Sequence, residues 1–359
     1  MKTISFISTL SSSPWGGSEE LWSQAALRLR QEGMEININV QFWPQMPKQI
    51  MQLAKAKCQI VTRKKQSFNN PNCDWFNLPR PDLVVISQSD SMQGLEWMQQ
   101  CLKRRIPYAN IVQKVMPSLW PHDSRVFELK TAYEKALASF FVSKRNLEMT
   151  KMMFCTPLNN AKIVKNPFKV NYQVRLSWPN SESNYKLACI ARLTARGKGQ
   201  DVLLEVMNQS KWRKRPIQIT LFGDGTNRKS LFTLKEMLKL DNVTFGGFIE
   251  NVESIWASHH ALILPSRHEG LPLALVEAML CARPCIVTNV GGNTELIEDN
   301  ITGFVACAPK KEYLDEAMER AWVRRKEWQE IGKLAANKVR EIIPPDPVGE
   351  FVEELKKII

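Results

Sequence analysis

Two glutamates and a Gly-Gly pair give residues 261–305, ALILPSRHEGLPLALVEAMLCARPCIVTNVGGNTELIEDNITGFV, their chemical character. Glu269 and Glu277 are eight positions apart. A carboxylate can accept paired hydrogen bonds from sugar hydroxyls or steady positive charge on a reacting carbon. Glycines such as Gly291-Gly292 let a backbone approach a ligand closely. The stretch therefore predicts a ligand-binding site with acidic side chains and closely approaching backbone.

The elements around these residues predict where the site lies. Apolar runs at 261–264 and 285–288 are typical of buried strands. A helix is expected over 271–281, with Pro272 in its first turn, where a missing N–H costs nothing. Another short helix is expected around Glu295. This alternation predicts a parallel α/β segment, in which ligands bind outside the carboxyl ends of the strands.

Two cations follow another predicted strand, residues 185–190. Arg192 and Lys198 lie just beyond it, in the segment ARLTARGKG. Cations at a strand end can neutralise a diphosphate leaving group as charge develops on it. Arginine offers a planar fork for two oxygens, whereas lysine offers a point charge. A solvated basic loop is the alternative for this segment.

A second glycine pair, Gly16-Gly17, lies between the first predicted strand, 3–10, and a helix over about 19–32. A glycine loop before a helix N-terminus can cradle a phosphate, although most such pairs are only turns. Glu19 and Glu20 fall in the first helical turn, where the helix dipole favours acids. We expect a capping role for them.

The motifs together resemble the donor-site signature of the group 1 (family 4) retaining glycosyltransferases. The matching pattern is Pro265-Ser266-x-x-Glu269-Gly270-x-Pro272-x-x-x-x-Glu277-Ala278-Met279, then Pro284, Gly291-Gly292-x-x-Glu295 and Thr302-Gly303-Phe304. The resemblance implies the GT-B fold, in which two doubly wound Rossmann-like α/β domains face a cleft and a C-terminal helix crosses back to the first domain.

The resemblance also implies roles for the site residues. Glu269 would face the transferred sugar, and Glu277 would accept hydrogen bonds from the two ribose hydroxyls. Arg192 and Lys198 would contact the diphosphate, and the loop with Gly16 and Gly17 would close over the donor. The backbone N–H groups of three residues would meet the sugar or phosphate: Gly270, Leu271 and Leu273. The nucleotide base would meet the segment Gly246-Gly247-Phe248-Ile249.

The implied reaction is a same-face substitution in which the departing diphosphate helps to deprotonate the acceptor. No Asp-x-Asp motif follows a predicted strand, so neither a metal nor a cofactor is expected, and the nucleoside diphosphate sugar is a co-substrate. Two departures from the family pattern stand out. Where the family often has a sugar-binding His after strand 107–112, this chain has Gln113, and His122 is the alternative. The Gly before the Pro of the second helix–strand turn is replaced in Ala282-Arg283-Pro284.

The predicted domains follow from the alternation of strands and helices. Residues 1–168 are expected to form an acceptor-binding domain, and residues 180–343 a donor-binding domain. The Asn-, Pro- and Ser-rich stretch 166–184 is the predicted linker. Residues 311–343 are predicted to be helical, and Pro344-Pro345 ends that helix before the crossover helix within 344–359.

Charge and cysteine usage narrow the partners and the compartment. Residues 1–172 contain 23 Lys and Arg against 12 Asp and Glu, and these account for most of the chain's net charge of +13. Such a face suits an anionic acceptor or an anionic membrane surface; an ordinary solvated surface is equally compatible. The basic clusters lack interleaved aromatics, so no nucleic-acid partner is expected. The eight scattered cysteines predict a cytoplasmic protein, peripheral at the inner face of the membrane if the anionic surface binds there.

Several alternatives remain open at this point. The acceptor could be a glycan, a lipid-linked molecule or another small acceptor, and the base and sugar of the donor are not readable. The GT-B fold also occurs in phosphorylases and nucleotide-sugar epimerases, and fold alone does not settle activity. A non-catalytic GT-B scaffold that binds a donor without turnover is the alternative from another class.

Overall fold

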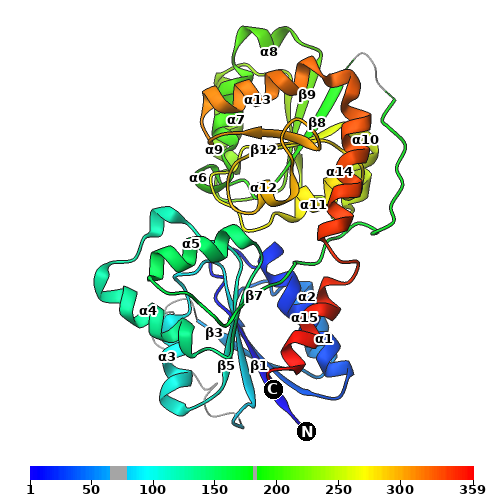
Figure 1. Cartoon of the computed structure of the whole chain (residues 1–359). Coiled ribbons are helices and arrows are strands. Elements are labelled where there is room, and N and C mark those ends of the chain that lie inside the picture. The colour runs from blue at the N-terminus through cyan, green and yellow to red at the C-terminus, as the bar shows by residue number, and fades with distance from the viewer. Residues whose placement is uncertain (65–78, 181–183) are drawn as a thin grey trace. The chain divides into compact units, whose positions relative to one another are not determined.

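The computed structural model describes residues 1–64, 79–180 and 184–359. The chain divides into two compact units. Unit 1 is Met1–Pro167 together with Asp346–Ile359, and unit 2 is Phe168–Pro345 (Figure 1). Each unit is built on its own parallel sheet, which places both in the α/β class. None of the described helices is both long enough and apolar enough to cross a lipid bilayer.

Unit 1 contains a seven-stranded sheet of order β3-β2-β1-β4-β5-β6-β7, in which every strand pair is parallel. Its central strands are mostly apolar and almost completely buried, as expected for a sheet covered on both faces. The strands are β1 Thr3–Ser8, β2 Glu35–Gln41, β3 Gln59–Arg63, β4 Leu83–Gln88, β5 Tyr108–Val112, β6 Ala138–Phe141 and β7 Ala161–Ile163.

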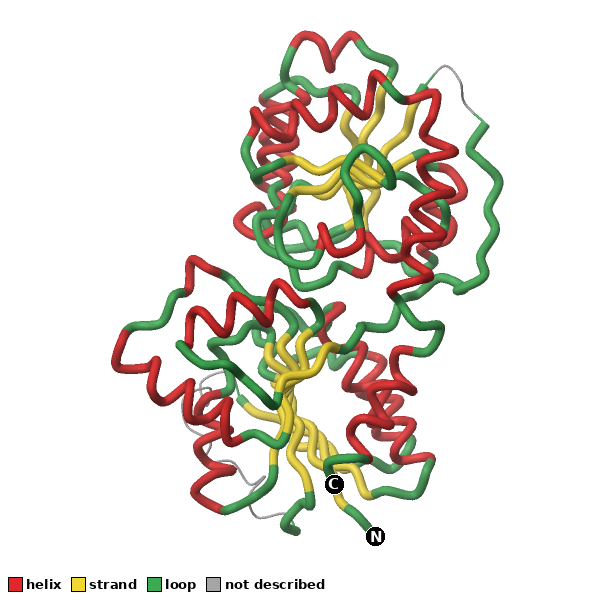
Figure 2. Tube along the Cα trace, in the orientation of Figure 1, coloured by secondary structure: helices red, strands yellow, loops and turns green. Residues whose placement is uncertain are grey.

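Helices lie on both sides of the unit 1 strands, as Figure 2 shows. Trp22 and Phe351 belong to the core on one face, which includes the C-terminal helix, and Tyr133 and Phe154 belong to the core on the other face. The helices are α1 Glu20–Gln31, α2 Lys48–Lys55, α3 Leu95–Arg104, α4 Asp123–Lys135, α5 Lys144–Phe154 and α15 Pro347–Lys356, with 3₁₀ turns η1 Gly17–Glu19 and η4 Pro117–Leu119.

The C-terminal helix α15 belongs to unit 1 although the chain has passed through unit 2 before it. Its N-cap is Asp346, which accepts from the Gly349 N–H at 2.9 Å and pairs with Arg28 of α1 at 2.6 Å. The Phe351 ring meets Phe140 edge to face at 5.1 Å. The last helix therefore completes the core of the first unit.

Unit 2 contains a six-stranded parallel sheet of order β10-β9-β8-β11-β12-β13. Its strands are β8 Tyr185–Ile190, β9 Ile217–Phe222, β10 Val243–Gly247, β11 Ala261–Leu264, β12 Cys285–Thr288 and β13 Gly303–Ala306. Its helices are α6 Ala195–Lys198, α7 Gln200–Met207, α8 Ser210–Lys214, α9 Arg228–Met237, α10 Val252–Ser258, α11 Leu273–Leu280, α12 Asn293–Leu296, α13 Lys311–Val323 and α14 Trp328–Ile342, with the 3₁₀ turn η5 Arg325–Glu327.

Two helix predictions in unit 2 were wrong in detail. The single helix expected over 311–343 is interrupted by η5. The interruption redirects the chain so that the Trp328 indole is buried and donates to the Ala321 carbonyl at 2.8 Å. Pro272 is not in the first helical turn: it is the N-cap of α11, with the extended angles φ −69° and ψ 128°.

The start of unit 2 also differs from the predicted start at residue 180. Three contacts tie the preceding segment to unit 2: Lys169 N–H donates to Glu277, Asn171 N–H donates to Glu253, and the Tyr172 hydroxyl donates to the Arg340 carbonyl. The segment contains few apolar residues, so no sequence pattern indicated that it packs on unit 2. Two of the three contacts are made by backbone N–H groups, which no side-chain pattern reveals. Residues 181–183 of the predicted linker lie outside the described residues.

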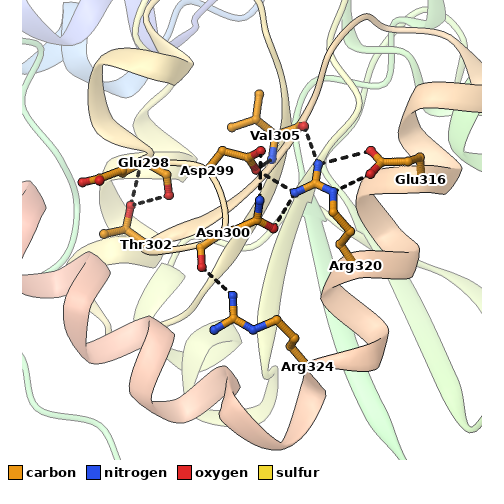
Figure 3. A network of polar contacts seen from close by, with 8 residues as sticks. All are labelled: Glu298, Asp299, Asn300, Thr302, Val305, Glu316, Arg320 and Arg324. Carbon is orange, nitrogen blue, oxygen red and sulfur yellow. Dashed lines mark hydrogen bonds and ion pairs between the residues drawn. The ribbon is translucent and has the colours of Figure 1, made fainter.

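A polar network fixes the loop between α12 and the edge strand β13 (Figure 3). Arg320 of α13 donates to Asp299 at 2.9 Å, to the Asn300 side chain at 2.6 Å and to the Val305 carbonyl at 2.9 Å. Glu316 pairs with the same guanidinium at 2.5 Å. Asn300 has φ +65°, so the network holds a left-handed turn at the amino end of β13.

Candidate functional site

The loop of residues 265–270 follows the carboxyl end of β11, and its backbone is closely packed against two glycines. A Cβ at Gly199 would lie 1.9 Å from the Pro265 carbonyl oxygen, and a Cβ at Gly291 would lie 2.2 Å from that of Glu269. Both glycines have positive φ, +66° and +51°, so only glycine suits these positions. The predicted Gly-Gly turn therefore packs directly against the acidic loop.

Glu269 is almost completely buried, with 5% of its surface exposed. Its Oε1 receives two donors: the Lys198 ammonium at 2.6 Å and the Ser266 hydroxyl at 2.7 Å. Its Oε2 has no hydrogen-bond partner in the described part of the chain. The structure thus brings the predicted sugar-facing acid and the predicted diphosphate-binding lysine into direct contact.

The loop that carries Lys198 is attached to the same region by Arg267. The Arg267 guanidinium forms a two-pronged ion pair with Asp201 at 2.7 and 2.8 Å and donates to the Ala195 carbonyl at 2.7 Å. The backbone N–H groups of Arg267 and His268 both reach the Gly197 carbonyl. Hydrogen bonding to Asp201 raises the pKa of Arg267 above its ordinary value, so this attachment keeps its charge.

Arg192 stands half-buried just beyond β8. Its carbonyl accepts from Gln200 Nε2 at 2.9 Å, which ties the strand end to the start of α7. A Cβ at Gly223 would lie 2.2 Å from the carbonyl oxygen of Ala191, and Gly223 has φ +123°. The backbone under Arg192 is therefore closely packed from the β9 side as well.

The start of α11 offers unused backbone donors. Within the described residues, the N–H groups of Gly270, Leu271 and Leu273 make no hydrogen bond. Helix N-termini carry such donors and a partial positive charge, which favours an anion or a carbonyl-like acceptor. Glu277, four residues into the helix, is buried, and its Oε1 accepts from the Lys169 N–H at 3.0 Å.

The segment predicted to meet the base comprises the last two residues of the edge strand β10 and the two residues after it. Gly246 packs against the Phe222 ring, where a Cβ would come within 2.3 Å, and Gly247 has φ +70°. The Gly247 carbonyl accepts from the Gly223 N–H at 2.7 Å. Phe248 is 76% exposed and Ile249 is half-buried. The exposed ring leaves an apolar surface at this strand end.

In unit 1, Gly16 is extended, with φ −168°, and Gly17 begins the turn η1. Glu19 is the N-cap residue of α1, but its side chain makes no capping hydrogen bond, so the expected capping role was wrong for this side chain. Its buried carboxylate instead accepts from the Ser8 hydroxyl at 2.6 Å, the Trp22 indole at 3.0 Å and the Ser18 hydroxyl at 3.2 Å. Burial raises the pKa of Glu19 despite these hydrogen bonds.

Gln113 and His122, the two candidates for the place of the family's sugar-binding histidine, differ in burial and in their contacts. Gln113 is buried, and its amide pairs reciprocally with that of Asn166 at 3.2 and 2.7 Å. His122 is exposed, precedes α4 and lies 3.3 Å from the Ser124 hydroxyl. The described residues contain no cluster of three or more His, Cys, Asp or Glu side chains that could hold a metal ion.

The sequence interpretation did not identify the role of Ser266. Its hydroxyl contacts Glu269, and its carbonyl accepts from the Thr288 hydroxyl at 2.5 Å. A signal was present, because Ser-x-x-Glu is the spacing at which a serine and a glutamate exchange hydrogen bonds at helix starts. Here the same spacing occurs in the loop before the helix.

Several known proteins are similar in sequence to part of this chain. The family model of glycosyl transferases group 1 matches residues 174–338. The chain is 33% identical over 134 residues to the alpha-D-kanosaminyltransferase of Streptomyces kanamyceticus, covering 36% of this chain and 34% of that protein. It is 30% identical over 165 residues to a 41.2 kDa protein in the cps region of Klebsiella pneumoniae, covering 44% and 43%. The matches thus span between about a third and less than half of these relatives.

The fold is also that of solved structures. Anabaena Alr3699/HepE in complex with UDP and glucose is similar over 99% of both chains, with a TM-score of 0.77 at 16% identity. The predicted α/β architecture is confirmed at this level, since a likeness of this kind shows the arrangement of the sheets and helices. Residues 174–338 therefore match the group 1 glycosyltransferase family, and the whole chain has the GT-B fold.

Proposed function

We propose that this chain transfers a sugar from a nucleoside diphosphate sugar to an acceptor hydroxyl, with retention of configuration at the anomeric carbon. The observation that carries the proposal is the buried Glu269, whose Oε1 contacts Lys198 and Ser266 and whose Oε2 has no partner among the described residues. A cation for the diphosphate and a carboxylate for the sugar then stand side by side.

In this proposal the diphosphate binds at Arg192, Lys198 and the free N–H groups of Gly270, Leu271 and Leu273. As the bond from the anomeric carbon to the phosphate oxygen breaks, negative charge grows on the leaving diphosphate, and preorganised donors stabilise it. Glu269 steadies the positive charge on the anomeric carbon.

The new bond forms on the face that the diphosphate leaves. The acceptor oxygen attacks the anomeric carbon, and its proton moves to the departing phosphate oxygen, so no protein nucleophile is needed. The cations of the protein provide the charge neutralisation, and we propose that the reaction is independent of a metal and of a cofactor.

The nucleoside is proposed to be held by Glu277 and the end of β10. One carboxylate oxygen of Glu277 accepts from Lys169, and this bond fixes the orientation in which the carboxylate meets the ribose hydroxyls. The base would meet the backbone at Phe248 and Ile249. Alr3699/HepE was crystallised with UDP and glucose, which favours uridine as the first nucleoside to test.

The acceptor is proposed to bind unit 1, with Gln113 or His122 as its candidate sugar contact. At the carboxyl edge of β1 and β2, unit 1 has a hollow lined in part by Trp15, Trp43 and Glu19. None of the described residues that line it is a cation, which favours an uncharged, hydroxyl-bearing part of the acceptor there.

An anionic membrane surface is a further proposed partner, because the first half of the chain carries most of the positive charge. This would place the protein at the inner face of the membrane. Co-sedimentation with anionic vesicles at low and high salt tests it: binding should occur at low salt and weaken as salt screens the charges. No binding at low salt contradicts a membrane partner and leaves the transferase proposal standing.

A thermal-shift screen with UDP, GDP, ADP and their sugars tests the transferase proposal. A ligand that binds only the folded state raises the melting temperature in proportion to the logarithm of its concentration. We expect one nucleoside diphosphate to stabilise the protein, and its sugar conjugate to be hydrolysed or transferred. Stabilisation without turnover by any acceptor would favour the non-catalytic scaffold, and no stabilisation would contradict both.

A further inference from the structure

The carboxylate of Glu269 is held asymmetrically. Two donors, the Lys198 ammonium at 2.6 Å and the Ser266 hydroxyl at 2.7 Å, share Oε1. The second oxygen, Oε2, has no partner in the described part of the chain. It is not fully buried, so a ligand can reach it. One oxygen is therefore occupied and the other is accessible.

Ser266 is fixed on both sides of its backbone. The Thr288 hydroxyl donates to the Ser266 carbonyl at 2.5 Å, and both side chains are fully buried. The strands before them are in register, with Leu264 of β11 opposite Val287 of β12. On the other side, the Pro265 carbonyl lies where a side chain at Gly199 would be, 1.9 Å from its Cβ position. The Ser266 hydroxyl consequently has little freedom to move away from Glu269.

Lysine alone would not orient the carboxylate in this way. The Lys198 ammonium has three donors on a flexible stem and acts as a point charge, so it can pair with either oxygen. A hydroxyl has one proton to donate, and Ser266 directs that proton to Oε1. The hydroxyl is the contact that distinguishes the two oxygens.

We propose that Ser266 is a positioning residue that holds Oε1 of Glu269 so that Oε2 faces the transferred sugar, and that Thr288 fixes Ser266 in this role. The inference rests on the proposed function, because it assigns Oε2 to the sugar of the donor. It goes beyond that function in naming two residues that touch neither substrate.

Ser266→Ala tests the first step. It removes the hydroxyl and leaves Lys198 as the partner of Oε1. We expect kcat to fall roughly tenfold to a hundredfold, the range for a lost hydrogen bond to a charged group. The affinity for the free nucleoside diphosphate should stay within about a factor of two, because Ser266 acts only on the sugar side. The probe is whichever of UDP, GDP and ADP gives the largest thermal shift, with its sugar conjugate as the donor.

Thr288→Val tests the second step, since valine keeps the shape and removes the hydroxyl. We expect a smaller fall in kcat, recovery in Thr288→Ser, and a double variant with Ser266→Ala that is no worse than Ser266→Ala alone, because coupled residues are not additive. Ser139→Ala is the matched control. It removes an equally buried serine hydroxyl from β6 of unit 1, and kcat should not change.

The outcomes separate the possibilities. An unchanged kcat in Ser266→Ala overturns the inference. A parallel fall of kcat, nucleotide affinity and melting temperature also overturns it, because a purely structural role would produce that pattern. Additive effects of Ser266→Ala and Thr288→Val overturn the part assigned to Thr288. Failure of the proposed function is distinguishable, because the unmodified protein would then transfer no sugar, whether or not it bound a nucleoside diphosphate.

Discussion

The Lys198 ammonium lies 2.6 Å from Oε1 of Glu269 and joins the segment after β8 to the loop after β11. The carboxylate is nearly buried and the lysine is 26% exposed. A diphosphate that binds Lys198 must share the ammonium with Glu269, so donor binding and the orientation of the acid are physically linked. Each member of the pair can be tested separately.

Glu269→Gln should greatly reduce transfer and preserve nucleotide affinity. Glutamine retains an oxygen that can accept from Ser266, but it lacks the negative charge proposed to steady the anomeric carbon. We expect kcat to fall about a hundredfold or more, as for other lost electrostatic contacts to a transition state. Removing a negative charge near the phosphates should, if anything, tighten nucleotide binding. Steady-state kinetics and a nucleotide titration check this; equal losses in both would show that Glu269 serves binding generally.

Lys198→Ala should have the complementary effect. The diphosphate loses a charge-assisted contact, so nucleotide affinity should fall about tenfold to a hundredfold. Isothermal titration with the nucleoside diphosphate measures it. Lys211→Ala is the matched control, because Lys211 also pairs with carboxylates in unit 2, Asp315 at 2.8 Å and Glu319 at 3.0 Å. Equal losses of affinity in both variants would contradict a diphosphate contact by Lys198.

The sequence supported the fold and the centre of the site because both follow from local patterns. Apolar runs predicted β8, β11 and β12 with their observed bounds. The spacing of the family motif identified Glu269 and Lys198 as candidate site residues. The short helix α2 and the half-exposed edge strand β3 were not predicted, since neither presents a long periodic pattern.

Other features depend on contacts that only folding creates. The bond between Thr288 and Ser266 joins two residues that are 22 positions apart in sequence, at the carboxyl ends of adjacent strands. Glu19 looked like a capping acid, yet the end of β1 places the Ser8 hydroxyl 2.6 Å from its carboxylate. No local pattern encodes either juxtaposition. The interruption of the helix 311–343 at η5 also depends on folding, because it allows Trp328 to be buried in the core of unit 2.

Glu19→Gln should change how stability depends on pH. The pKa of Glu19 is raised by burial from its ordinary value of 4.5, so the folded protein holds this proton more tightly than the unfolded chain. The stability linked to that proton is fully present below pH 4.5 and is lost as the pH rises through the folded-state pKa. Glutamine does not ionise, so the variant should gain stability relative to the unmodified protein as the pH rises above 4.5 and through the folded-state pKa. Melting temperatures across this range measure the difference; a constant difference would contradict the raised pKa.

Ala282→Gly should stabilise unit 2. Ala282 follows α11 with φ +55°, and the hydrogen bonds from Arg283 N to Ala278 O and from Ala282 N to Met279 O form a Schellman turn. A left-handed alanine costs about 1–2 kcal/mol, and the greater freedom of glycine in the unfolded chain returns part of this. We expect a gain of about 0.5–1 kcal/mol in the free energy of unfolding. Ala257→Gly, at an exposed helical position of α10, should instead lose about 1 kcal/mol. A loss in both would show that the turn is not strained.

Arg320→Ala should destabilise unit 2 without affecting the site. The guanidinium reaches the Asp299 and Asn300 side chains, the Val305 carbonyl and Glu316, as Figure 3 shows. Losing these contacts should lower the free energy of unfolding by about 1–3 kcal/mol. Arg320→Lys should recover little, because one ammonium cannot reproduce the planar fork.

The control for Arg320 is Lys333→Ala, which removes an exposed pair with Glu330 and should cost at most about 0.5 kcal/mol. Chemical denaturation measures stability, and a nucleotide titration measures the site. The network lies at the amino end of β13, whereas Glu269 follows the carboxyl end of β11, so nucleotide affinity should be unchanged in both variants. A marked loss of affinity in Arg320→Ala would mean that the loop of residues 298–302 helps to shape the donor site through β13 and α12.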